Sequence, residues 1–121
     1  MNSKEKFISK RTNQYKKLLE KLPLDIQNAC QETFNNWKKN SSSLKMKTLA
    51  QLSDEAISAE INLRYRALGF RTKENGKNIY TWFWIGSHED YNKVIANQAI
   101  TTKIRKMRNS DQCIQKNKPS L

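Results

Sequence analysis

The feature that most constrains this fold is an apolar run from 79 to 85, which follows a turn signal at Asn75-Gly76. The run has no polar side, because Ile79, Thr81, Phe83 and Ile85 alternate with Tyr80, Trp82 and Trp84. A strand that is apolar on both faces is typical of the inside of a sheet that is covered on both sides. The sequence therefore predicts an internal strand, around which the other elements are arranged.

The segment before the turn is predicted to be the antiparallel partner of this strand. Between 59 and 67, small and apolar residues alternate with the polar residues Glu60, Asn62, Arg64 and Arg66. A period of two predicts one strand with a buried and an exposed face. Asn-Gly tolerates the positive φ of a tight reversal. Because the pair lies in a polar stretch from 72 to 78, we expect a loop of more than two residues.

The N-terminal half is predicted to contain two helices. A short strand over 6–10 precedes a helix that is capped by Thr12 or Asn13 and has a stripe of Tyr15, Leu18, Leu19 and Leu22. Pro23 separates it from a second helix over 24–39, whose stripe is Ile26, Cys30, Phe34 and Trp37. Alternation over 44–49 predicts a further strand, with Lys45 and Lys47 outward, and 51–58 is interpreted as a polar link.

The C-terminal helix is predicted to begin at His88, with Ser87 as its cap, and to continue through Val94 and Ile95. The whole order is strand, two helices, three strands and a helix. It predicts an α+β fold in which a helical hairpin packs on one face of a small, mainly antiparallel sheet. A chain of 121 residues suits one core, so we expect one domain over 1–97 and a basic, partly disordered extension over 98–121.

The charge balance predicts an anionic partner. Lys and Arg number 23 against 11 Asp and Glu, a net charge of +12, which favours nucleic acid, a ribosome, an acidic protein or an anionic membrane surface. No apolar run is long enough to span a bilayer and the N-terminus does not resemble a signal peptide, so we expect a cytoplasmic protein. With one His, and with Cys30 and Cys113 far apart, the sequence predicts no metal and no cofactor.

Several local motifs together resemble the RelE/ParE superfamily, the toxins of bacterial type II toxin–antitoxin systems. They are the helix break at Leu22-Pro23, the run Leu44-Lys45-Met46-Lys47, the strand with Tyr65-Arg66-Ala67-Leu68, and Gly86-Ser87-His88-Glu89-Asp90-Tyr91. The last is similar to the G-T-H-x-x-Y-D ending of the HigB branch. Asn92 departs from it, since that pattern has Asp, and Arg64-Tyr65 stands where relatives often turn at Gly-Asn or Gly-Asp. The resemblance covers about residues 6 to 96.

The resemblance implies a toxin that cuts messenger RNA on the ribosome without a metal and is neutralised by an acidic antitoxin. Arg66 would steady the scissile phosphate, and His88 and Tyr91 would transfer protons or orient a base. The residues implied to bind the RNA backbone are Lys45, Lys47, Arg64 and Arg71. The departures at Asn92 and Arg64-Tyr65 leave open an altered site or a toxin-like relative without activity.

The residues themselves fit such chemistry but leave alternatives open. Metal-free RNA cleavage needs a base, an acid and positive charge near the phosphate, and a spacing of three places His88 and Tyr91 on one side of a helix. Equally, His88 is a plausible helix-start residue, Tyr91 a residue packed on Trp82 or Trp84, and Arg64 and Arg66 a solvated strand face. The alternative functions are inhibition of DNA gyrase, as in ParE-type toxins, and non-catalytic binding of an acidic partner or nucleic acid.

Overall fold

The computed structural model describes residues 7–50 and 52–97. Within them the chain forms five strands and three helices, in an α+β arrangement that confirms the predicted fold class. Their bounds are β1 (Phe7–Arg11), α1 (Asn13–Glu20), α2 (Leu24–Lys39), β2 (Lys45–Thr48), β3 (Ala56–Glu60), β4 (Tyr65–Glu74), β5 (Lys77–Ser87) and α3 (His88–Ala96). The predicted extension over 98–121 lies outside the described residues.

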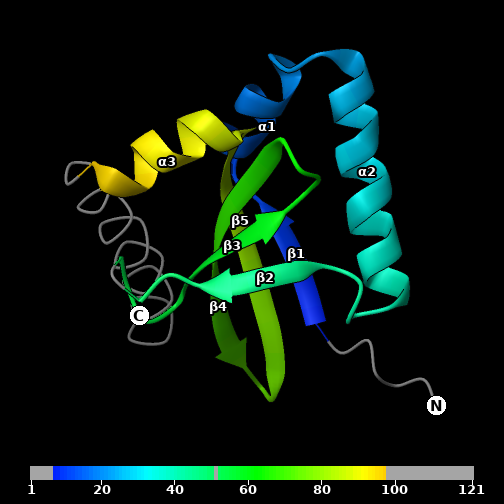
Figure 1. The fold of residues 1–121 in the computed structure, drawn as a ribbon. Coiled ribbons are helices and arrows are strands. Elements are labelled where there is room, and N and C mark those ends of the chain that lie inside the picture. Colours follow the sequence, from blue (N-terminus) through cyan, green and yellow to red (C-terminus); the bar gives the residue numbers. More distant parts are fainter. Residues whose placement is uncertain (1–6, 51, 98–121) are drawn as a thin grey trace.

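The described strands form one sheet in the order β1-β5-β4-β3-β2. β1 is parallel to β5 and the other pairs are antiparallel. Because β5 lies between β1 and β4, it is internal, as its two apolar faces predicted. Figure 1 shows α2 on one side of the sheet and α3 on the other. The helical hairpin of α1 and α2 therefore covers one face, here termed the hairpin face, and α3 lies on the opposite face, termed the α3 face.

The helices form where periodicity and capping agree. The Thr12 hydroxyl oxygen accepts a hydrogen bond from the Tyr15 backbone N–H at 3.1 Å and starts α1. On the hairpin face Trp37 stacks on Phe7 with ring centroids 4.3 Å apart and contacts Tyr80 edge-on at 4.8 Å. The stripes of both helices thus meet aromatic side chains of β1 and β5 in the larger core.

The prediction of a single strand over 59–67 is wrong, because a turn divides it. The backbone N–H of Ile61 donates to the Tyr65 carbonyl at 3.0 Å, which closes the turn between β3 and β4. The Asn62 side-chain oxygen accepts from the backbone N–H groups of Arg64 and Tyr65 at 2.8 and 3.0 Å. Such a side-chain bond reverses the backbone without glycine. In the described part, four strands rather than three follow α2, and β3 begins within the predicted link.

The hairpin between β4 and β5 is tighter than predicted. Glu74 pairs with Lys77, so the loop has only Asn75 and Gly76, whose φ values are 53° and 78°. Positive φ at both positions is the geometry that two-residue hairpins favour. The longer loop expected from the polar stretch 72–78 is therefore wrong, because its outer residues pair within the ladder.

An irregularity in β5 changes which of its side chains share a face. Leu68 pairs with Trp84 and Gly69 with Trp82, which leaves Phe83 as an extra residue. A Cβ atom on Gly69 would lie 2.7 Å from Cε3 of Trp82, so only glycine leaves room for that ring. After this bulge Ile85 lies in the same core as Trp82, whereas Phe83 packs on the α3 face. The strict alternation predicted for 79–85 is wrong at this point.

Candidate functional site

An open pocket of about 190 Å³ lies on the α3 face, where β2, β3 and β4 run beside the start of α3. Its lining brings together five of the seven site residues predicted from the sequence, together with three others. The residues around it are Lys45, Met46, Lys47, Ser58, Glu60, Arg66, His88 and Tyr91. The three strands contribute them in register, since Lys45 pairs with Glu60 and Glu60 with Arg66. Paired residues share a sheet face, so cation, carboxylate and cation form one row.

The guanidinium of Arg66 is held by the turn that precedes β4. Its Nη1 donates to the Asn62 carbonyl at 2.6 Å and to the Tyr65 carbonyl at 3.1 Å. Within the described residues the other guanidinium nitrogens make no hydrogen bond. Arg66 therefore offers a fork of N–H donors that is already positioned toward the pocket.

The start of α3 places the imidazole of His88 at the pocket. The Ser87 hydroxyl oxygen accepts from the Asp90 backbone N–H at 3.1 Å, which confirms the predicted cap. The His88 backbone N–H donates to the Arg64 carbonyl at 2.7 Å and ties the helix to the β3–β4 turn. The rings of His88 and Tyr91 lie 6.0 Å apart with planes inclined by 26°, so the two residues do face one side.

Tyr91 is mainly a core residue. It is 4% exposed and packs among Leu49, Leu52, Ala56, Leu68, Phe70 and Phe83 on the α3 face. Trp82, one of the two aromatic partners that the sequence suggested, lies on the hairpin face instead. Tyr91 thus packs in the core next to the exposed ring of His88.

The remaining two predicted RNA-binding residues do not line the pocket. Arg64 lies exposed in the turn at its edge, where its carbonyl holds the start of α3. Arg71 is exposed on β4, five residues beyond Arg66. An odd spacing places it on the opposite face, at roughly 16 Å along the strand. Arg71 is therefore separated from the site.

Glu60 and Ser58 line the pocket but were not predicted as site residues. Glu60 is half-buried and is the one carboxylate in the lining. Ser58 is 4% exposed, and its hydroxyl makes no hydrogen bond to the described residues. The sequence signal that could have revealed Glu60 is Asn62, a residue type that favours turns. A turn at Asn62 places β3 beside β4 and Glu60 opposite Arg66.

Among the described residues there is no group of three or more His, Cys, Asp or Glu side chains that is placed to hold a metal ion. None of the helices within 7–50 and 52–97 is both long enough and apolar enough to span a bilayer. The pocket lining offers Lys, Arg, His and Glu side chains together with the hydroxyls of Ser58 and Tyr91.

Comparison with known proteins identifies the fold. No protein-family model matches the sequence, and no curated protein sequence matches it. Among solved structures the chain is similar to one in the crystal structure of the toxin–antitoxin complex RelBE2 from Mycobacterium tuberculosis, with a TM-score of 0.54 and 20% sequence identity. The match covers 68% of this chain and 98% of that chain. The chain therefore has a RelE-like fold, as the sequence motifs predicted.

Proposed function

We propose that this chain is the toxin of a type II toxin–antitoxin system and that it cleaves messenger RNA on the ribosome. The observation that carries the proposal is the convergence of Arg66, His88, Glu60 and two lysines on one open pocket. The RelE-like fold supports it, because the similar solved chain comes from a toxin–antitoxin complex. The net charge of +12 supports an RNA-rich target and an acidic antitoxin as partners.

In the proposed reaction, the RNA supplies its own nucleophile. Glu60 takes the proton from a ribose 2′-hydroxyl, and the resulting oxygen attacks the adjacent phosphorus. The Arg66 guanidinium donates hydrogen bonds to the phosphate oxygens as negative charge develops on them. Protonated His88 gives its proton to the departing 5′-oxygen. The products are a 2′,3′-cyclic phosphate and a 5′-hydroxyl. The proposed step consumes no water molecule and uses no metal ion.

The other pocket residues have binding and supporting roles in this proposal. Lys45 and Lys47 are exposed on β2 and contact the phosphates on either side of the scissile bond. Arg64 extends this cationic surface at the edge of the pocket. Tyr91 orients His88 from beneath, and its low exposure argues for this role rather than for proton transfer.

Glu60→Gln is expected to slow cleavage about 100-fold or more, because the amide has the same shape but cannot accept the 2′-hydroxyl proton. The measurement is the single-turnover rate on a short message held by purified translating ribosomes. Glu74→Gln is the matched control, since Glu74 is exposed at the far end of β4. Cleavage by Glu60→Gln at the control rate would remove Glu60 from the reaction.

A further inference from the structure

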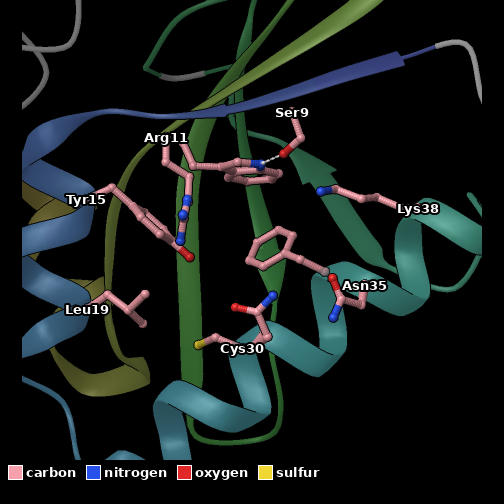
Figure 2. Close-up of a pocket in the computed structure, with 10 residues that line it drawn as sticks. Ser9, Arg11, Tyr15, Leu19, Cys30, Asn35 and Lys38 are labelled. Carbon is pink, nitrogen blue, oxygen red and sulfur yellow. Dashed lines mark hydrogen bonds between the residues drawn. The ribbon is translucent and has the colours of Figure 1, made fainter.

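A second cavity, of about 220 Å³, lies on the hairpin face between β1, α1 and α2 (Figure 2). The proposed cleavage does not use it, because the sheet separates it from the pocket of Arg66 and His88. Two cations line it, Arg11 from β1 and Lys38 from α2, together with the amides of Gln31 and Asn35. No carboxylate is present in the lining. The cavity is therefore rich in hydrogen-bond donors and has no negative charge to pair with them.

Tyr15 brings a buried hydroxyl to the lining of this cavity. Tyr15 is 1% exposed, yet its hydroxyl makes no hydrogen bond to the described residues. Figure 2 shows the Tyr15 hydroxyl, from α1, and the Arg11 guanidinium, from β1, extending to the same part of the cavity. Burial raises the pKa of Tyr15 above its ordinary value, so the group stays protonated and remains a donor. A buried donor without a partner is costly, and an acceptor that enters the cavity removes that cost.

Part of the cavity wall is apolar and is formed by Phe34, Trp82, Leu19 and Cys30. The Trp82 indole N–H donates to the Ser9 hydroxyl at 3.2 Å, which leaves the ring itself as a wall. The Phe34 ring lies beside it, with centroids 5.3 Å apart. Burial raises the pKa of the Cys30 thiol to about 11, so it carries no charge at neutral pH. These walls suit a short aliphatic stem behind an anionic group.

We propose that this cavity binds a carboxylate on a short aliphatic stem, as a glutamate side chain of an acidic partner polypeptide provides. The Tyr15 O–H and the Arg11 guanidinium donate to the carboxylate oxygens, and Lys38 adds positive charge from the α2 side of the cavity. The Arg fork matches carboxylate and phosphate alike, but the Phe34 and Trp82 rings in the lining favour an anion that carries an aliphatic stem over inorganic phosphate. That the partner is an antitoxin rests on the proposed function, but the binding itself does not.

The test is a titration of the isotope-labelled full chain with N-acetylglutamate N-methylamide, followed by NMR at the Trp82 indole N–H signal. We expect a saturable shift in roughly the millimolar range, as suits a ligand of few atoms. Tyr15→Phe and Arg11→Gln are each expected to weaken the probe about tenfold. Lys93→Gln, which removes a charge from α3 on the other face, is the matched control and leaves the affinity unchanged.

Tyr15→Phe also separates a binding role from a structural one. Its melting temperature is expected to stay within about 2 °C of the wild type or to rise, because no described partner loses a hydrogen bond. Absence of a saturable shift, wild-type affinity for the probe in Tyr15→Phe or in Arg11→Gln, or binding of inorganic phosphate as tight as that of the probe would each overturn the assignment. None of these measurements depends on RNA cleavage, so they test the carboxylate site independently of the proposed toxin activity.

Discussion

Arg66→Ala is expected to reduce the single-turnover rate of message cleavage about 100- to 1000-fold while the fold persists. The guanidinium is the half-buried cation of the pocket, and two backbone carbonyls hold it in place before substrate arrives. Removal of one positioned donor to a developing oxyanion has an effect of about this size. Arg66→Lys keeps the charge but loses the fork, so its rate is expected to lie between those of the wild type and Arg66→Ala.

Arg71→Ala is the matched control for this experiment. It removes the same side chain from the same strand, but from the opposite face and away from the pocket. Circular dichroism and thermal melting of both variants establish that each is folded. If Arg66→Ala cleaves as fast as Arg71→Ala, the phosphate is not attacked in the pocket of Arg66 and His88.

Trp37→Ala is expected to lower the free energy of unfolding by about 3–5 kcal/mol, which is a large part of the stability of a small domain. The Trp37 ring is 1% exposed and contacts Phe7, Phe34, Tyr80 and Trp82. Its truncation leaves a cavity where α2, β1 and β5 meet. Equilibrium unfolding in urea, followed by far-ultraviolet circular dichroism, measures the loss.

Trp84→Ala is the corresponding control. Trp84 lies on the same strand as two of the rings that contact Trp37, but it is half-buried and packs at the edge of the smaller core. A clearly smaller loss is expected there, since less apolar surface returns to water. Equal losses in the two variants would show that the aromatic cluster on the hairpin face is not the main source of stability.

The helices were predictable because two independent signals agree at their ends. The Thr12 and Ser87 caps and the break at Pro23 coincide with the apolar periodicity, and each is a local property of the chain. The turn at Asn62 was missed because apolar and polar residues continue to alternate through it, so a period of two cannot reveal the reversal. The bulge at Phe83 depends on the contact between Gly69 and Trp82, which no local pattern encodes.

The site residues that could be predicted from the sequence are those that lie at the beginning of a strand or helix. Arg66 follows the turn before β4, and His88 opens α3 directly after β5, so strand pairing brings the two together. Glu60 was not recognised, because its position opposite Arg66 requires the β3–β4 turn. Arg71 was grouped with the RNA-binding residues that the resemblance implies, but its position on β4 places it on the opposite face of the sheet from the pocket.

The most direct test of the central proposal is to map new 5′ ends on a reporter message within minutes of inducing the chain in bacteria. A second reporter lacks only its start codon. We predict 5′-hydroxyl ends within the codons of the translated reporter and none in the untranslated one. Equal cutting of both reporters would contradict ribosome dependence. Intact messages would contradict the nuclease, with growth arrest pointing to a target such as gyrase and normal growth to a non-catalytic binding protein.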